Sequence, residues 1–185
     1  EGAVLVLAGA GSGKTRVLTT RIAYLVEEKG VHPSNILSIT FTNKAANEMR
    51  ERLLRMTDAA GMWICTIHSM CVRILRMFAS RRGLSENFSI YSDQEQAAVL
   101  KQIFKELGLD KGEGKDSLFK NVRYHISAAK TEGLSAAEYA AKHAFERDIE
   151  EVTKVFEAYT LRLRQNNALD FDDLLSEARA LLAED

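Results

Sequence analysis

Cysteine is scarce in this chain, and no apolar stretch is long enough to cross a membrane. The two cysteines, Cys65 and Cys71, are six positions apart, a spacing that matches no C-x-x-C metal or redox motif. We interpret both as core residues of a reducing, cytoplasmic protein. The apolar residues near the start are too few to span a bilayer and follow the acidic Glu1, which indicates neither a signal peptide nor a membrane anchor.

Acidic residues are absent between Ala59 and Ser85, a stretch that contains four arginines. The chain as a whole has a net charge of −1, yet residues 1–82 carry 12 Lys+Arg and 6 Asp+Glu, whereas residues 83–185 carry 13 and 20. A basic first half favours a polyanionic partner, although a solvated basic face would give the same count.

Methionine is absent from position 1, and an apolar run begins almost at once. We therefore expect that processing or trimming removed the original start. With 46% hydrophobic and 28% charged residues, the 185-residue chain is globular and long enough for one α/β domain with an insertion.

A glycine-rich segment, Ala8–Thr15, is the strongest signal in the sequence. It matches the pattern G-x-x-x-x-G-K-[ST] except at its first position, which is alanine. The apolar run Ala3–Leu7 predicts a strand buried on both faces of a parallel sheet, and the apolar spacing after the segment predicts a helix that ends at Gly30. Strand, loop and helix in this order predict a phosphate-binding loop, against the alternative of a glycine-rich turn with an incidental lysine.

The residues of this loop suit a polyphosphate. Gly11 and Gly13 form the tight part, so that successive N–H groups face the anion above the positive end of the helix. Lys14 would reach the β- and γ-phosphates, and the Thr15 hydroxyl would bind Mg²⁺; these two are the predicted catalytic residues. The predicted nucleotide-binding residues of the loop are Ala8, Gly9, Ala10, Gly11, Ser12, Gly13, Lys14 and Thr15.

Two further strand–helix pairs follow. Residues 36–41 predict a strand, and Thr42 or Asn43 caps the helix after it. Residues 63–66 predict a third strand, followed by a helix that ends at Gly83. Three strand–helix pairs in succession predict a parallel sheet with right-handed crossovers.

The carboxyl ends of the second and third strands carry side chains that suit single-stranded nucleic acid. Phe41 and His68 would stack on bases, and the hydroxyl, amide and amino groups nearby would contact phosphates. Without the neighbouring phosphate loop, helix capping would explain the hydroxyls, and Phe41 would be a core residue. The predicted DNA-binding residues are Phe41, Thr42, Asn43, Lys44, Thr66, His68 and Ser69.

From residue 84 onwards, helices alone are predicted. Ser92 with Glu95 and Ser135 with Glu138 form capping boxes, and the apolar stripes of these helices predict a packed core. We interpret residues 84–167 as an all-helical insertion between residues 1–83 and a return segment, residues 168–185. Four cations in the insertion offer contacts to a nucleic-acid backbone, although a solvated loop explains them better: Lys111, Lys115, Lys120 and Arg123.

Three aspartates occur in the return segment: Asp170, Asp172 and Asp173. A magnesium-binding pair of the Walker B type would follow an apolar strand, but the residues before these aspartates are polar. We therefore predict that Asp170 caps a helix and that the other two face its positive end.

Four segments, in order, resemble the superfamily 1 DNA helicases of the UvrD/Rep/PcrA type. Residues 8–16 resemble motif I, residues 39–46 motif Ia and residues 66–69 motif Ib, and residues 169–175 are similar to the segment that re-enters the ATPase domain. The resemblance covers nearly the whole chain. It implies an α/β fold of the P-loop NTPase (RecA-like) class, with part of domain 1A and the inserted helical domain 1B.

The same resemblance implies an activity. Members hydrolyse ATP to move 3′ to 5′ along single-stranded DNA and separate duplexes in repair or replication. ATP and Mg²⁺ would be the cofactors, and DNA and a second RecA-like domain of the same protein the partners. Arg16 would lie near the triphosphate, beside Lys14 and Thr15. Phe41, Thr42, Asn43, Thr66 and His68 would line the DNA track.

Other parts of the family's site are missing from the sequence. These are an upstream glutamine that reads adenine, a downstream Asp-Glu pair for magnesium and the attacking water, and arginines of the second domain. Because phosphoryl transfer needs such charges, we expect this N-terminal piece alone to bind nucleotide weakly and to be inactive. The alternatives are another P-loop ATPase, such as the motor of a helicase–nuclease or a remote kinase-like protein, and a module that only binds.

Overall fold

The computed structural model describes residues 2–9 and 11–184. Internal contacts divide the chain into two units, residues 1–70 and 71–185, each with its own hydrophobic core. The first unit contains, in order, α1 (Lys14–Glu27), a 3-10 turn (Pro33–Asn35), β1 (Leu37–Thr40), α2 (Asn43–Leu54) and β2 (Trp63–Thr66). Helix α3 (Ile67–Met77) follows and crosses the boundary between the units.

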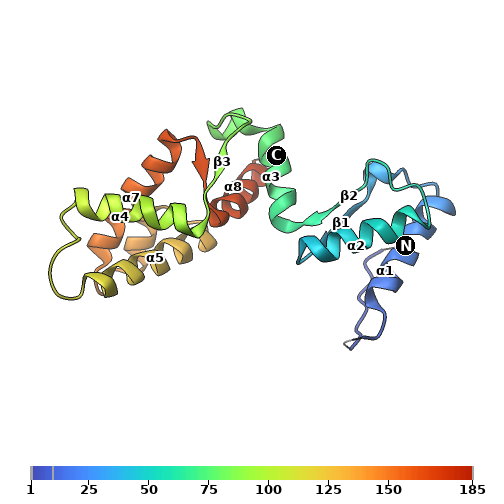
Figure 1. The fold of residues 1–185 in the computed structure, drawn as a ribbon, viewed down its shortest axis with the longest axis horizontal. Helices are drawn as coiled ribbons and strands as arrows, with labels where there is room; N and C mark the ends of the chain where they lie inside the picture. The colour runs from blue at the N-terminus through green and yellow to red at the C-terminus, as the bar shows by residue number, and fades with distance from the viewer. Residues whose placement is uncertain (1, 10, 185) are drawn as a thin grey trace. The chain divides into compact units, whose positions relative to one another are not determined.

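The sheet of the first unit consists of β1 and β2, which pair in parallel (Figure 1). The register pairs Leu37 with Trp63 and Thr40 with Thr66, so both strands end at the same level. Ile64 faces a core formed with α1 and α2, whose buried residues are Ile22, Ala46, Met49 and Leu53. The predictions of the second and third strands and of their parallel pairing are confirmed.

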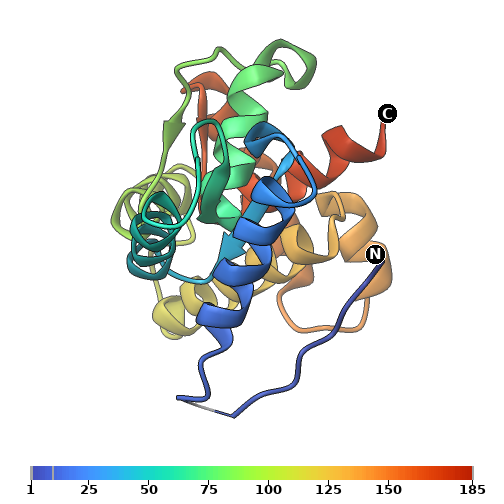
Figure 2. The same cartoon turned by 90° about the vertical axis from the view of Figure 1, so that its right-hand side faces the viewer.

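The first predicted strand is wrong in this structure. Residues 2–9 form no strand and run as an extended segment towards α1 (Figure 2). Their apolar side chains are exposed, Leu5 to 83% and Leu7 to 85%. An apolar run becomes a strand only where a neighbouring strand completes its hydrogen-bond ladder. Neither β1 nor β2 pairs with these described residues.

The helix after β2 also differs from the prediction. α3 ends at Met77, and a separate 3-10 helix, η2 (Ala79–Arg82), precedes Gly83. Phe78 between them has φ −124° and ψ 28°, outside the α-helical range, which breaks the run. Cys71 on α3 is buried as predicted, whereas Cys65 on β2 is half-buried.

The second unit is a helical bundle with its own core. Its helices are α4 (Asp93–Glu106), α5 (Lys115–Glu132), α6 (Ala136–Lys142), α7 (Ile149–Gln165) and α8 (Phe171–Ala183). α7 packs against α4, α5 and α6 (Figure 1). Ile103, Val122 and Val155 are fully buried in the core of this unit. Both predicted capping boxes are present, at Ser92 with Glu95 and at Ser135 with Glu138.

The sequence predicted helices alone from residue 84 onwards, but this unit also contains strands. Two short strands, β3 (Ser89–Ile90) and β4 (Ala168–Leu169), pair in parallel. Ser89 N donates to Asn167 O at 2.9 Å, and Tyr91 N donates to Leu169 O at 2.8 Å. The pairing joins segments about 80 residues apart in sequence, so local apolar periodicity did not reveal it. It brings the chain entering the helices beside the chain leaving them.

Three buried residues and one half-buried residue connect α5, α7 and α8. We call them the Lys130 cluster: Lys130, Tyr159, Asp170 and the half-buried Asp173. Lys130 is only 6% exposed, and its ammonium lies 2.6 Å from Asp170 Oδ2 and 2.8 Å from Asp173 Oδ1. The Tyr159 hydroxyl donates to Asp170 Oδ2 at 3.0 Å. Asp170 caps α8, as predicted, and forms a capping box with Asp173.

Two carboxylates share one ammonium in this cluster, and their pKa values shift in opposite directions. Burial raises the pKa of Asp173 to about 6, and the charge of Asp170 adds to the rise, although Lys130 opposes it. Burial also acts to raise the pKa of Asp170, but the charge and hydrogen bond of Lys130 outweigh it, and the result is a lowered pKa. Asp173 therefore gains a proton near pH 6, while Asp170 stays ionised.

The cluster predicts a pH-dependent effect of Asp173→Asn. The folded-state pKa of Asp173 lies above its unfolded value, so its ionisation costs stability as pH rises from about 4 to 6. Asparagine removes this cost, and we expect the stability advantage of the variant over the parent to grow by about 2 kcal/mol between pH 4.5 and pH 7.5. Denaturant unfolding of the 185-residue chain at both pH values measures the difference.

Asp172→Asn is the matched control, since Asp172 is in the same helical turn but outside the Lys130 cluster. Asp172→Asn removes one carboxylate from the first turn of α8 but keeps the pairing of Asp170 and Asp173 with Lys130. A difference for Asp173→Asn that does not grow between pH 4.5 and 7.5 would contradict the assignment.

Candidate nucleotide and nucleic-acid site

The glycine-rich loop precedes α1 and turns by means of residues with positive φ. Gly11 has φ 73° and Gly13 has φ 87°, conformations that L side chains rarely adopt. The Ser12 hydroxyl donates to Gly9 O at 2.6 Å and steadies the turn. Gly13 is the N-cap of α1, which begins at Lys14. Ala10, also predicted to bind nucleotide, lies outside the described residues.

The Lys14 ammonium folds back over this loop. It donates to Ala8 O at 2.9 Å and to Gly9 O at 2.6 Å, in an exposed position. Because both partners are neutral carbonyls at the surface, phosphate oxygens can replace them with stronger, charge-assisted bonds.

The start of α1 has the features that a polyphosphate needs. Gly13 provides no side-chain cap, and the first turn contains no acidic residue, so the N–H groups there face solvent with the positive end of the helix dipole. Thr15 and Arg16 are exposed in this turn. The Thr19 hydroxyl donates to Thr15 O and Arg16 O, both at 3.0 Å, which fixes the turn from its buried side. These residues fit a magnesium-bound triphosphate.

The two predicted DNA-contacting segments meet at one edge of the sheet. Because Thr40 pairs with Thr66, residues 41–44 and residues 66–69 continue from neighbouring strand ends. The prediction that these segments share the carboxyl edge of a parallel sheet is confirmed. No strand pairing joins the described residues 2–9 to this edge.

The hydroxyls of two threonines at this edge accept hydrogen bonds from the main chain. Thr42 Oγ1 accepts from Ala45 N at 3.1 Å and caps α2. Thr66 Oγ1 accepts from Ser69 N at 3.3 Å at the start of α3 and lies 2.9 Å from Ser69 Oγ. Their hydroxyls are therefore engaged within the protein, and capping holds both segments in place.

Other side chains at the edge face solvent. Phe41 is 104% exposed, which excludes the alternative of a core residue. Asn43 and Lys44 are exposed at the start of α2, where Lys44 lies 4.0 Å from Glu48, and His68 is half-buried. An exposed aromatic ring beside an ammonium and amide groups can stack on a base while neighbours contact phosphate.

Arg50 supports this edge and was missed from the sequence. Its guanidinium donates to Ile64 O at 2.5 Å and to Asn47 Oδ1 at 2.9 Å, which ties α2 to β2. Arg50 is on the polar face of α2, and its partner is a main-chain carbonyl on β2. The sequence pattern around Arg50 therefore did not indicate this contact.

Comparison with known proteins identifies the family. The model of the UvrD/REP helicase N-terminal domain matches residues 1–185. The chain belongs to this family. Among curated relatives, the ATP-dependent DNA helicase PcrA of Staphylococcus aureus (strain Mu50) is 46% identical over 177 residues, and that of Staphylococcus epidermidis (strain ATCC 35984) is 47% identical over 177 residues.

The match to these family members covers 95% of this chain but only 24% of each relative. The chain thus spans about a quarter of their length. Within residues 2–9 and 11–184, no helix is long and apolar enough to cross a membrane.

The capping role of Thr42 predicts a stability difference between two substitutions. Thr42→Ala removes the acceptor for Ala45 N and should lower the free energy of unfolding by about 1 kcal/mol. Thr42→Ser keeps the acceptor and should unfold like the parent. The fluorescence of Trp63, the single tryptophan, reports unfolding of the first unit. Equal stability of the alanine and serine variants would show that the hydroxyl does not cap α2.

Proposed function

We propose that this chain is the ATP-binding and single-stranded-DNA-binding portion of an ATP-dependent DNA helicase. The observation that carries the proposal is the β1–β2 register, which puts residues 41–44 and 66–69 at one edge. A positive-φ glycine loop with an exposed lysine is in the same unit. Membership of the UvrD/REP helicase N-terminal domain family, and relatives that are named ATP-dependent DNA helicases, support the same proposal.

Each cofactor has a set of proposed ligands. Residues 8–16 bind the ATP phosphates, with Lys14 as the charged group, and the Thr15 hydroxyl binds Mg²⁺. When bound, the metal and lysine neutralise charge on the phosphates during transfer. The described residues contain no cluster of three or more His, Cys, Asp or Glu that could hold a metal. The magnesium site therefore depends on Thr15, the nucleotide and other parts of the protein.

We also propose the domain boundaries, the polarity and the cellular role that the resemblance to UvrD/Rep/PcrA-type helicases implies. The chain is divided into part of domain 1A (residues 1–83), domain 1B (residues 84–167) and a return segment (residues 168–185). The intact protein contains a second RecA-like domain, moves 3′ to 5′ and acts in the cytoplasm in repair or replication. This chain alone lacks the groups for hydrolysis and only binds.

Lys14→Ala tests the nucleotide role in the intact protein. Loss of the ammonium removes a preorganised charge, and we expect DNA-stimulated ATP hydrolysis to fall by about 10² or more while single-stranded DNA still binds. Steady-state phosphate release and fluorescence anisotropy measure the two properties. Lys29→Ala, at the other end of α1, is the control and should retain hydrolysis. Turnover retained by Lys14→Ala would refute the role.

Phe41→Ala tests the DNA role in the 185-residue chain. Because base stacking on an aromatic ring contributes about 1–3 kcal/mol, binding of an oligothymidylate should weaken by that amount at every salt concentration. Lys44→Ala should instead reduce the dependence of binding on salt by about one phosphate contact.

Phe145→Ala is the matched control, since that ring is 105% exposed in the second unit. Both phenylalanine variants should unfold like the parent, because neither ring is packed. Equal weakening by the two variants, or affinity independent of salt, would exclude a specific DNA surface at the strand ends.

A further inference from the structure

The second unit contains an open cavity that the proposed function does not use. It has a volume of about 740 Å³ and lies along α7 and α8, beneath the turn from α5 to α6; we call it the α7–α8 groove. Its walls include Leu134, Ala137, Phe156, Leu161 and Ala180. Sites for small organic molecules have roughly this volume and mostly apolar walls with a few polar groups.

The Lys130 cluster forms part of the floor of the groove. Lys130 and Asp173 both line it, and the side chain of Asp173 is 15% exposed, compared with 3% for Asp170. The cluster holds two carboxylates and one ammonium. Its excess negative charge therefore reaches the groove through Asp173.

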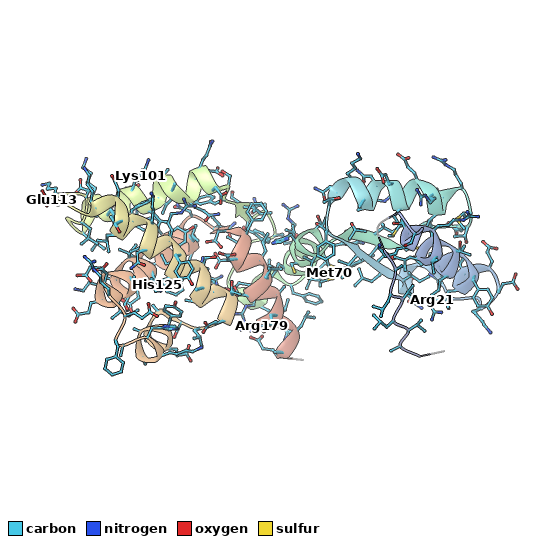
Figure 3. All side chains as sticks on the ribbon, turned by 90° about the horizontal axis from the view of Figure 1, so that it is seen from below. Arg21, Met70, Lys101, Glu113, His125 and Arg179 are labelled. Atoms are coloured by element: carbon cyan, nitrogen blue, oxygen red, sulfur yellow. The ribbon has the colours of Figure 1, made fainter. Side chains whose placement is uncertain are left out.

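The other charges along the groove have partners within the protein. Arg82 and Arg164 both bind Glu177, and Arg82 also donates to Glu184 Oε1 at 2.5 Å. Arg179 is on α8 (Figure 3). It donates to Glu132 O, at the end of α5, at 3.3 Å. The cations are thus engaged with acceptors of their own.

Two other carboxylates line the groove in settings unlike that of Asp173. Glu138 is held in the capping box with Ser135, and Glu157 is exposed on α7. Asp173 is half-buried, and it shares the ammonium of Lys130 with a second carboxylate, Asp170, so that one cation faces two anions.

We propose that the α7–α8 groove binds a small organic cation with an apolar body, whose ammonium or guanidinium group pairs with Asp173. The body lies against the apolar walls and excludes water from the ion pair. This site goes beyond the helicase function and does not depend on it.

The acidity of Asp173 supports the proposal and gives it a pH dependence. Its raised pKa, about 6, reflects burial and the neighbouring charge of Asp170. The titratable groups around it are Lys130 on α5, Tyr159 and Arg164 on α7, and Asp170, Asp172 and Glu177 at or on α8. A bound cation favours the ionised carboxylate, so binding should be tighter at pH 7.5 than at pH 5.

The test uses a pair of probes with one apolar body, 4-phenylbutylamine and 4-phenylbutyrate. Nuclear magnetic resonance titration of the 185-residue chain follows the amides of α6, α7 and α8. We expect saturable shifts there with the amine, and binding of the carboxylate weaker by about tenfold or more. Asp173→Asn should weaken amine binding about tenfold and remove its pH dependence, whereas Asp172→Asn should leave both unchanged.

A variant that fills the groove tests whether binding needs the space of the groove as well as the charge of Asp173. Ala137 is exposed on α6, so Ala137→Trp should fold normally and block the amine. Amine binding that survives in Ala137→Trp would overturn the proposal. So would equal affinity for the two probes, or unchanged affinity in Asp173→Asn whose spectrum shows the parent fold.

Discussion

The parallel pairing of β1 with β2 is the constraint on which the candidate site depends. Parallel strands bring equivalent ends of two distant segments to one edge, whatever the sequence between them. Here Thr40 lies beside Thr66, and the chain leaves both strands into helices that threonines cap. A shift of register by one residue would move Phe41 relative to residues 66–69 and turn Ile64 away from the core.

The phosphate loop depends on a different, local constraint. Gly13 starts α1 at positive φ and without a side-chain cap, so the helix dipole acts on whatever binds there. The next residue, Lys14, donates hydrogen bonds to carbonyls of the same loop. The first unit therefore combines a locally encoded candidate anion site with a candidate DNA-binding edge that long-range pairing builds.

Features encoded by nearby residues were predictable from the sequence. The bounds of β2, the cap at Thr42 and the capping boxes at Ser92 and Ser135 each depend on residues within a few positions. The site segments followed from the same local signals, because strand ends and helix caps mark them. Burial of Phe41 could not be judged from its sequence context, since exposure is set by the elements around it.

The order strand, helix, strand predicted the β1–β2 pairing, but the other features that join distant segments were not predictable. Residues 3–7 have the composition of a buried strand, but a strand needs a ladder partner, and neither β1 nor β2 supplies one. β3 pairs with β4 across nearly the whole bundle. Lys130 follows the buried Ala129 on α5, which is only a weak indication that Lys130 is itself buried. Its partners, Asp170 and Asp173, are about 40 residues away in sequence and could not be inferred from this position.

Photochemical cross-linking tests most directly whether the two strand ends form one DNA surface. A short oligothymidylate with a single 4-thiothymidine at successive positions would be bound to the chain, irradiated and analysed by mass spectrometry. We expect cross-links from neighbouring nucleotides to residues 41–44 and to residues 66–69 of the same molecule. Cross-links confined to one of these segments, or to residues 71–185, would contradict it.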